Sequence, residues 1–332
     1  MTGNFLIICE QRDGLLHKVS LELIGKARAL IEGLPPDLGG CSPKVVALIM
    51  GHNIAPLAQD LINHGADKAI YVDDAMLKDF MTQPYTKAVC AVIADEKPAI
   101  ALIGATSIGR DLAPRVAARI KTGLTADCTT LEIDEETGEL LMTRPAFGGN
   151  VMATIVCPNH RPQMATVRPG VMVALEAKPR AGEVTQFRVC FEPSDVNVEI
   201  LETTKIVKTT KDIAEASILV AGGRGTGDKF AMLVDLAKVL GGEVAASRAA
   251  VDAGHAHKDK QVGQTGQTVR PDVYIAAGIS GAVQHTAGME ESALIIAINR
   301  DADAPIFGIA DLGIVGDVHK IVPKLVARLK RG

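Results

Sequence analysis

Short apolar segments alternate with amphipathic ones from the N-terminus to about residue 125. The apolar segments are four to six residues long without polar interruption, which is the pattern of strands buried on both faces. Between them, apolar side chains recur three or four positions apart, as on one face of a helix. The alternation predicts a mostly parallel sheet covered by helices, with strands at Phe5–Cys9, Val45–Met50, Ala69–Val72 and Ala99–Ile103.

The pattern changes between Cys128 and Phe191, where short alternating segments are separated by turn residues. Glu135–Gly138 is typical of a hairpin turn, because its glycine tolerates a positive φ. These segments predict antiparallel strands appended to the parallel sheet, at Thr129–Ile133, Glu139–Arg144, Met152–Val156, Met164–Arg168 and Val184–Val189.

A polar segment at Glu192–Ala216 separates this half from a second region of strand and helix alternation. We expect the domain boundary there, with domains at 1–204 and 205–332. The fold class is therefore α/β: an N-terminal parallel-sheet domain with appended antiparallel strands, then a Rossmann-like α/β domain. Its strands are predicted at Ile218–Ala221, Val244–Ala246, Val273–Ala276, Leu294–Ile298 and Pro305–Gly308, and a last helix at Val322–Leu329.

Composition limits the classes of partner. The 332 residues are 47% hydrophobic, which is enough for packed cores, and the net charge of −4 gives no basic surface for nucleic acid. No apolar run approaches the ~18 residues of a membrane span. Without a signal-peptide start or a C-x-x-C pair among its six cysteines, the chain is predicted to be cytoplasmic with reduced thiols. No third ligand accompanies His255 and His257, so no metal site is predicted.

The strongest local signal for a ligand is the glycine-rich segment Gly222–Gly227, between a predicted strand and an amphipathic run. Glycines allow close approach of the backbone, and main-chain N–H groups at a helix start attract anions. The segment lacks the third glycine of the Rossmann fingerprint, and Glu243 is the nearest acidic candidate for a ribose. Arg224 favours a bound anion, because a cation among main-chain N–H groups has little structural use without one.

Further polar segments follow the other C-terminal strands. Ser247–Asp252 follows one predicted strand, and Ile279–His285 follows another. Gln261–Gly266 is rich in amides, hydroxyl and glycine, while Asn299 and Asp317 lie at element ends. Because ligands bind outside the carboxyl ends of parallel strands, we expect these segments to converge on one rim.

Each segment also has a purely structural interpretation. The glycine turn can stand without a ligand, Arg248 can pair with Asp252 on the surface, and the amide-rich segment can be a solvated loop. His285 can be a buried structural histidine, and Ser280 can cap a helix. In the N-terminal half, Gly104–Arg110 resembles an anion-binding turn, but a structural or subunit-contact role is favoured.

Together these segments resemble one known family. They comprise Gly222–Gly225, Ser247–Gly254, Gln261–Gly266, Gly278–His285 and Ala304–Phe307, and in the N-terminal half Gly109–Ala118 and Arg161–Pro169. With them the chain resembles a bacterial electron transfer flavoprotein alpha subunit over essentially its whole length. One departure is the short loop Gly225–Lys229 after Arg224.

The resemblance implies FAD as the cofactor of the C-terminal domain and a beta subunit as the partner in a heterodimer. Arg224 and the glycine turn would approach the pyrophosphate and adenosine, with Ser247 nearby. Val262–Thr265 would line the flavin and its ribityl chain, and Asn299 would hold the adenine end. The full set implied for FAD is Gly222, Gly223, Arg224, Gly225, Ser247, Arg248, Gln261, Val262, Gly263, Gln264, Thr265, Gly266, Ser280, Gly281, Ala282, Val283, Gln284, His285, Asn299, Asp317 and Val318.

Three of these residues would tune the redox chemistry of the flavin. Arg248 would lie against the isoalloxazine ring, the Thr265 hydroxyl near N5, and His285 near the C2 carbonyl. Because arginine is always charged, Arg248 would favour the negative charge that the flavin gains on reduction.

The resemblance implies a carrier that shuttles electrons one at a time, through a stabilised semiquinone, between dehydrogenases such as acyl-CoA dehydrogenase and other redox partners. A bifurcating version, which oxidises NADH through a second FAD in the beta subunit and reduces ferredoxin or flavodoxin, stays open. On the residues alone, two other classes also stay open: a non-redox adenine-nucleotide-binding sensor or structural subunit, and an NAD-dependent group-transfer enzyme.

Overall fold

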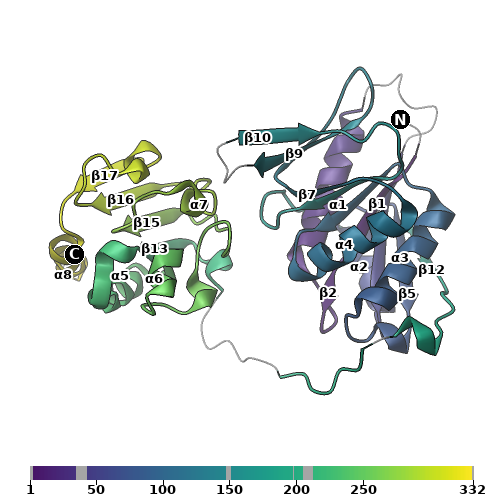
Figure 1. Ribbon diagram of the computed structural model, residues 1–332, viewed down its shortest axis with the longest axis horizontal. Coiled ribbons are helices and arrows are strands. Elements are labelled where there is room, and N and C mark those ends of the chain that lie inside the picture. The colour runs from purple at the N-terminus through teal and green to yellow at the C-terminus, as the bar shows by residue number, and fades with distance from the viewer. Residues whose placement is uncertain (1–2, 35–42, 147–150, 197, 205–211, 331–332) are drawn as a thin grey trace. The chain divides into compact units, whose positions relative to one another are not determined.

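The computed structural model describes residues 3–34, 43–146, 151–196, 198–204 and 212–330 of the chain (Figure 1). These residues form two compact units. Unit 1 contains the described residues of Met1–Ala146 and Val151–Thr203, and unit 2 those of Thr204–Gly332. Residue 205, where the sequence predicts the second domain to begin, lies outside the described residues, so that boundary stays a prediction.

Unit 1 is built on one sheet of seven strands in the order β12-β5-β4-β1-β6-β11-β7. Every neighbouring pair in this sheet runs parallel. The central strands β1, β4 and β6 are buried at every position, as their apolar sequences predict. The strands are β1 (Phe5–Cys9), β4 (Val45–Gly51), β5 (Lys68–Asp73), β6 (Ile100–Gly104), β7 (Leu124–Cys128), β11 (Gln163–Val167) and β12 (Glu183–Gln186).

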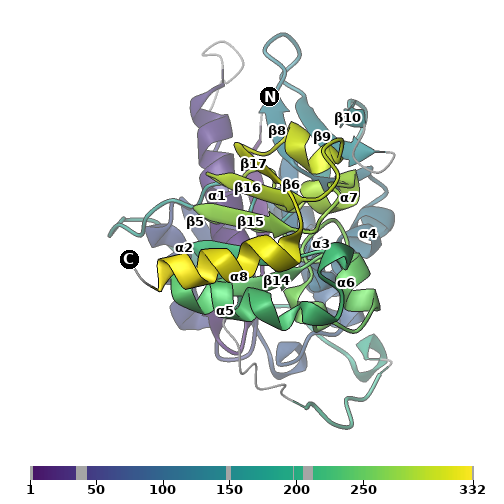
Figure 2. The same ribbon diagram turned by 90° about the vertical axis from the view of Figure 1, so that its left-hand side faces the viewer.

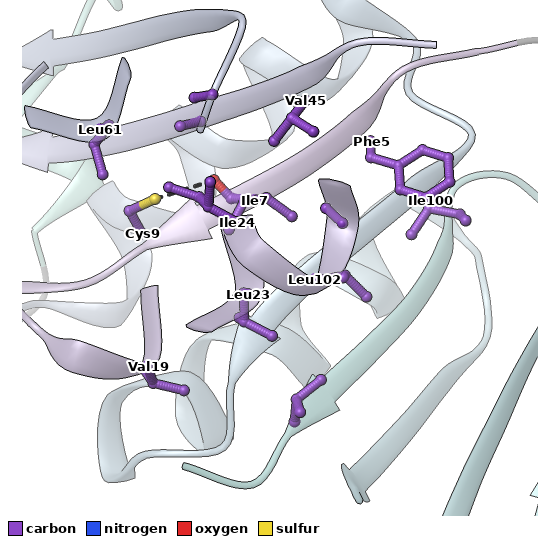
Figure 3. Packing of buried hydrophobic residues seen from close by; sticks show 14 of the residues in the cluster. Phe5, Ile7, Cys9, Val19, Leu23, Ile24, Val45, Leu61, Ile100 and Leu102 are labelled. Carbon is purple, nitrogen blue, oxygen red and sulfur yellow. Dashed lines mark hydrogen bonds between the residues drawn. The ribbon is translucent and has the colours of Figure 1, made fainter. Parts of the chain in front are cut away.

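Helices cover both faces of this sheet, and successive side chains of β1 point to opposite faces. Phe5, Ile7 and Cys9 pack in the core that includes α1 and α2 (Figure 3). Leu6 and Ile8 pack in the core that includes α3 and α4. The helices are α1 (Lys18–Glu32), α2 (Ala55–Asn63), α3 (Thr82–Glu96) and α4 (Ser107–Ile120). The predicted parallel α/β arrangement is confirmed.

Two segments predicted as antiparallel strands belong instead to the parallel sheet. β11 inserts between β6 and β7, and β12 pairs with β5 at the sheet edge. β11 is buried at every position, so its apolar residues belong to a central strand rather than to a half-exposed one. The antiparallel sheet has the order β10-β9-β8. Its strands are β8 (Thr130–Ile133), β9 (Leu140–Ala146) and β10 (Val151–Ile155), and a short hairpin joins β2 (Gln11–Arg12) to β3 (Leu15–Leu16).

The turn between β8 and β9 forms where the sequence predicts it. Gly138 has a φ of +70°, and its N–H donates to the main-chain oxygen of Asp134 at 2.8 Å. The Asp134 carboxylate accepts the main-chain N–H groups of Thr137 and Glu136. These hydrogen bonds to Thr137 and Glu136 lower the pKa of Asp134.

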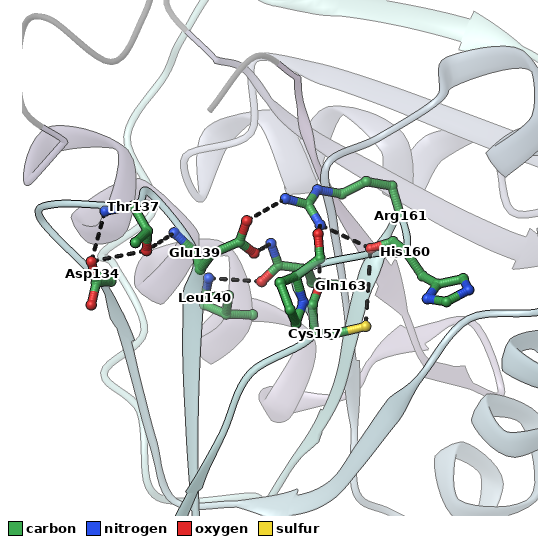
Figure 4. Close-up of polar contacts among 9 residues, drawn as sticks. Asp134, Thr137, Glu139, Leu140, Cys157, His160, Arg161 and Gln163 are labelled. Atoms are coloured by element: carbon green, nitrogen blue, oxygen red, sulfur yellow. Dashed lines mark hydrogen bonds and ion pairs between the residues drawn. The ribbon is translucent and has the colours of Figure 1, made fainter.

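Gln163 joins the antiparallel sheet to the parallel one. Its side chain is fully buried, and its Oε1 atom accepts the N–H of Leu140 at 2.7 Å. Its Nε2 atom donates to the carboxylate of Glu139. The guanidinium of Arg161 pairs with the same carboxylate at 2.7 Å (Figure 4). This network holds the start of β9 against the start of β11.

Unit 2 is a second α/β unit, with a five-stranded parallel sheet in the order β14-β13-β15-β16-β17. Figure 2 shows α5 and α8 lying across this sheet, and Leu233 and Val322 lie in the core on that face. Val262 and Ile306 lie in the core on the other face. The elements are β13 (Ile218–Gly222), α5 (Ala231–Leu240), β14 (Glu243–Ala246), α6 (Arg248–Asp252), β15 (Val273–Ala277), α7 (Val283–Thr286), β16 (Ile295–Asn299), β17 (Leu312–Val315) and α8 (Val318–Leu329).

The last strand and the last helix of unit 2 differ from the prediction. Pro305–Gly308, predicted as a strand, is a 3-10 turn, and the fifth strand is β17. Proline presets φ for a first helical turn, which outweighs the apolar pattern after it. α8 begins at Val318 rather than at Val322, because the Asp317 carboxylate accepts the N–H of His319 at 2.9 Å and caps the helix there.

Among the described residues, no helix is long and apolar enough to cross a membrane. The cysteines that the structure describes are free thiols, and Cys41 lies outside the described residues. Burial raises the pKa of Cys128 to about 12 and that of Cys9 further still, so both thiols are neutral near pH 7.

We predict that Gln163→Leu destabilises unit 1 by about 1–3 kcal/mol, because it leaves the buried N–H of Leu140 without an acceptor. Urea unfolding measures the change. Gln186→Leu, at an exposed position of β12, is the matched control, and we expect its effect to stay within about 0.5 kcal/mol. Equal unfolding midpoints for the two variants would contradict this role of Gln163.

Candidate functional site

The loops that follow the strands of unit 2 enclose a cleft of about 630 Å³. Gly223, directly after β13, and Gly278, directly after β15, line it. Numbered within unit 2, the strand order is 2-1-3-4-5, in which the connections turn to opposite sides between the first and third strands. Doubly wound sheets bind ligands at this point, and the volume lies in the range of ligand sites.

The cleft brings together most of the residues predicted for FAD, although they come from five separate segments of the chain. The predicted residues that line it are Gly223, Arg224, Gly225, Ser247, Arg248, Gln261, Val262, Gly263, Thr265, Ser280, Ala282, Gln284, His285 and Asn299. The expected convergence of polar segments on one rim is therefore seen in the fold.

The other predicted residues, Gly222, Gln264, Gly266, Gly281, Val283, Asp317 and Val318, do not line the cleft. Gly222 lies in β13, where a Cβ atom would sit 2.3 Å from the ring of Phe230, so its glycine is needed for packing. Asp317 caps α8 through its side chain, and Val318 is buried in the core.

The glycine turn uses its main-chain amides differently from the prediction. The N–H of Gly223 donates to Ala277 at 2.9 Å, and that of Gly225 donates to Gly278 at 3.1 Å. A Cβ atom on Gly223 would lie 2.1 Å from the oxygen of Gly278, so the glycine is needed for this contact. These two amides therefore have partners within unit 2, and the exposed Arg224 is the charged residue of this turn that favours an anion.

Ser247 and Arg248 lie at the start of α6, directly after β14. Ser247 caps this short helix, because its Oγ atom accepts the N–H of Ala250 at 3.3 Å. The Nε atom of Arg248 lies 3.4 Å from a carboxylate oxygen of Asp252, and the side chains are 68% and 66% exposed. The structural interpretation of the sequence analysis thus holds, because Arg248 pairs with Asp252, and both of these residues also line the cleft.

The Gln261–Gly266 loop is held against α7 by main-chain contacts. The N–H of Gln264 donates to the oxygen of Gln284 at 2.8 Å. Gly263 has a φ of +132°, and a Cβ atom there would lie 2.5 Å from the same oxygen. The buried amide of Gln261 donates to the Thr265 Oγ1 atom at 2.8 Å. Thr265 thereby keeps its own hydroxyl proton for another acceptor.

His285 is the most buried ionisable side chain at the cleft, with 6% of its surface exposed. Its Nε2 atom lies 2.9 Å from the hydroxyl of Tyr274. Its Nδ1 atom is buried and has no hydrogen-bond partner within the described chain. Burial lowers the pKa of His285 to about 4, and a weaker hydrogen-bonding contact with the main chain of Val262 opposes this shift. The imidazole is therefore neutral near pH 7.

Eight residues outside the set implied for FAD also line the cleft: Ala249, Asp252, Gly278, Ile279, Arg300, Asp301, Ala304 and Pro305. Of these, only Arg300 and Asp301 lie outside the segments that the sequence analysis singled out. Arg300 and Asp301 directly follow β16, so their position after a strand was the signal that could have found them. Asn299 is held by its Nδ2 atom, which donates to the oxygen of Ile279 at 2.9 Å. Ser280 does not cap a helix, because Ala282 is the residue that precedes α7.

Glu243, considered for a ribose, lies at the other end of its strand. It begins β14, whereas the cleft follows the strand ends, and its carboxylate pairs with Lys260 at 3.3 Å. Glu243 is thus a structural residue, and it does not line the cleft.

The Gly104–Arg110 turn of unit 1 has a structural role. Thr106 caps α4, because its Oγ1 atom accepts the N–H of Gly109 at 3.0 Å. The Thr106 hydroxyl in turn donates to the carboxylate of Glu10. Thr106 thus links the start of α4 to Glu10, which supports the structural interpretation of this turn.

Comparison with known families decides the identity of the fold. The electron transfer flavoprotein domain family matches residues 5–192, and the electron transfer flavoprotein FAD-binding domain family matches residues 212–290. The chain belongs to the electron transfer flavoprotein alpha-subunit family. FAD is accordingly its cofactor, and the second match covers most of the segments that line the cleft.

Several relatives match this chain along nearly its whole length. The electron transfer flavoprotein subunit alpha of Clostridium acetobutylicum is 52% identical over 98% of this chain and 96% of its own. The same subunit of Megasphaera elsdenii is 48% identical over 98% of this chain and 96% of its own. The acryloyl-CoA reductase electron transfer subunit beta of Anaerotignum propionicum is 44% identical over 98% and 95%.

The residues of the cleft fit a flavin dinucleotide. Arg224, Arg248 and Arg300 bring positive charge for an anionic pyrophosphate, and Asp252 and Asp301 only partly offset it. The buried Nδ1 atom without a protein partner is the expected feature of a side chain that hydrogen-bonds a ligand.

The lowered pKa of His285 predicts a pH dependence of folding. The folded-state pKa of about 4 lies below the ordinary 6.5, so the unfolded chain takes up the proton first as pH falls. The stability contributed by neutral His285 is fully present above pH 6.5 and is lost toward pH 4, by about 3 kcal/mol in all. We expect His285→Gln to lose less stability than the wild type in urea unfolding between these pH values. His257→Gln, at an exposed site, should follow the wild type, and a His285→Gln curve parallel to the wild type would contradict the prediction.

Gly263→Ala tests the packing of the amide-rich loop. The new Cβ atom would meet the Gln284 oxygen at a φ that L-residues rarely adopt, so the loop must shift from α7. We predict at least about tenfold weaker FAD retention, equivalent to about 1.4 kcal/mol, in equilibrium dialysis of the heterodimer. Gly308→Ala, which has open space around its added methyl group, is the control. Equal retention in both variants would show that the loop does not need this glycine.

Proposed function

We propose that this chain shuttles electrons one at a time, through a stabilised semiquinone, between a flavin dehydrogenase and other redox partners. The observation that carries the proposal is the arrangement of one cation and two hydrogen-bond donors at one cleft of a FAD-binding unit. Arg248 begins α6, Thr265 lies in the Gln261–Gly266 loop and His285 lies on α7, and all three line the same cleft. The FAD-binding domain supports this redox role over a non-redox adenine-nucleotide sensor.

Arg248 supplies the charge in this proposal. A unit charge about 4 Å from a negative charge contributes about 4 kcal/mol at an effective dielectric of about 20. The Arg248 side chain is 68% exposed and shares its charge with Asp252, so water and the carboxylate screen it. A contribution of about 1 kcal/mol is the expected scale for such an exposed charge.

Thr265 and His285 supply neutral donors. Gln261 donates to the Thr265 oxygen, which leaves the Thr265 proton for flavin N5. His285 is buried and uncharged near pH 7, so it acts on the C2 carbonyl by hydrogen bonding rather than by charge. The chain's own residues therefore orient the ring and favour its electron-rich form from two sides.

The remaining cofactor contacts are assigned by position in the cleft. We place the pyrophosphate near the exposed Arg224 and the adenine end near Asn299, whose amide is fixed by Ile279. The Val318 side chain is buried in the core, so any contact with adenine uses its main-chain atoms. Asp317 is exposed and caps α8 with one carboxylate oxygen, which leaves its other oxygen for such a contact.

Alpha subunits of this family pair with a beta subunit. For the dehydrogenase we propose an acyl-CoA dehydrogenase or a similar flavoenzyme. The name of the Anaerotignum propionicum relative, an acryloyl-CoA reductase electron transfer subunit, supports this choice. Electron bifurcation from NADH to ferredoxin or flavodoxin requires a second FAD in the beta subunit. Flavin content of the purified heterodimer, measured together with NADH oxidation, separates bifurcation from simple transfer.

Arg248→Ala tests the proposed function. Removal of the positive charge makes the first reduction of the flavin harder, so its potential should fall by about 40 mV, which is about 1 kcal/mol at about 59 mV per tenfold. The semiquinone yield in a stepwise reductive titration should fall with it. Arg248→Lys keeps the charge and should recover most of the potential.

The titration is run on FAD-loaded heterodimers with equal flavin content. Arg300→Ala, which removes a charge from another part of the cleft, controls for a general loss of positive charge. A potential in Arg248→Ala equal to that of the wild type would remove the proposed role of this residue.

A further inference from the structure

A buried tyrosine contacts His285 from the side of the sheet. Tyr274 is the second residue of β15, the middle strand of the unit 2 sheet, and its side chain is fully buried. It packs with Leu219 and Ile295 of the neighbouring strands. Its ring centre lies 6.1 Å from that of His285. The tyrosine does not line the cleft, so any effect on a ligand passes through the histidine.

The direction of the hydrogen bond between the two side chains follows from burial. The Tyr274 hydroxyl and the His285 Nε2 atom are 2.9 Å apart, and either one can donate. If His285 donated, the proton of the buried hydroxyl would have no acceptor among the described residues, which is costly. If Tyr274 donates, its proton is used, and the single proton of the neutral imidazole must sit on Nδ1.

We propose that Tyr274 is a positioning residue that holds His285 in the tautomer with its proton on Nδ1, and so makes the imidazole a donor to the flavin. The proposal rests on the proposed function, in which His285 lies at the flavin. Nδ1 is the nitrogen that has no hydrogen-bond partner in the described chain. In the other tautomer Nδ1 would accept, and it would repel a carbonyl oxygen that becomes electron-rich on reduction.

The fixed sheet position of Tyr274 gives this arrangement its precision. Tyr274 pairs with Ile295 of β16 and Leu219 of β13, so its backbone is held on both sides. His285 lies on the short helix α7, whose N–H groups bond back to Ala282. The tyrosine therefore links the orientation of the imidazole to the middle strand of the sheet.

Tyr274→Phe tests the inference, because it removes the hydroxyl and keeps the ring that fills the core. The heterodimer is labelled with 15N-histidine, and the two imidazole nitrogens of His285 are identified by their loss in His285→Gln. In the wild type we expect the chemical shifts of a proton held on Nδ1. In Tyr274→Phe we expect values averaged between the two tautomers.

A reductive titration of the same samples gives the second readout. At equal FAD content, the equilibrium constant for the first one-electron reduction of the flavin should be about threefold smaller in Tyr274→Phe than in the wild type. The first reduction potential then falls by about 28 mV, at about 59 mV per tenfold. Tyr85→Phe is the matched control, because it removes another buried tyrosine hydroxyl, bonded to Leu77 at 2.8 Å in unit 1. It should leave both the His285 signals and the potential unchanged.

The outcomes separate this inference from the proposed function. A wild-type spectrum with the proton on Nε2, or a Tyr274→Phe variant with wild-type signals and potential, would overturn the role of Tyr274 and leave the electron carrier intact. A wild-type heterodimer that forms no semiquinone in the reductive titration would overturn the proposed function, while the histidine signals would still report on the tautomer.

Discussion

The cleft depends on the reversal of strand order between β13 and β15. The connections that follow these two strands turn to opposite sides of the sheet, which leaves a crevice at the carboxyl ends of the strands. Gly223 and Gly225 keep the two strand ends in contact through their amides, which bond to Ala277 and Gly278. The other segments of the cleft are held by contacts of their own, such as that of Gln264 with Gln284 and that of Asn299 with Ile279.

A second theme is that buried partners set which atoms of the site can donate. Gln261 donates to Thr265, and the bond of Tyr274 with His285 engages one imidazole nitrogen. The side chains of Gln261 and Tyr274 are almost completely buried, so they lose few alternative conformations when a ligand binds. Arg248 is different, because it is exposed and shares its charge with Asp252. The site thus combines two rigid neutral donors with one adaptable cation.

The sequence predicted the two parallel sheets well, because fully buried strands such as Phe5–Cys9 are uniformly apolar. It misplaced β11 and β12, since a short apolar segment does not show whether its neighbours run parallel or antiparallel. Most cleft residues were predicted through the resemblance and through their places after strands. Local sequence patterns do not predict the partners of the glycine-turn amides or the contact of Tyr274 with His285, because both depend on tertiary packing.

The central claim is that FAD binds along the carboxyl ends of β13 and β15, with its ring at Arg248 and His285. A crystal structure of the FAD-loaded heterodimer tests it most directly. The account predicts flavin density in this cleft, with the C2 carbonyl oxygen about 2.7–3.2 Å from the Nδ1 atom of His285. Flavin bound elsewhere in the complex, with this cleft filled only by solvent, would contradict it.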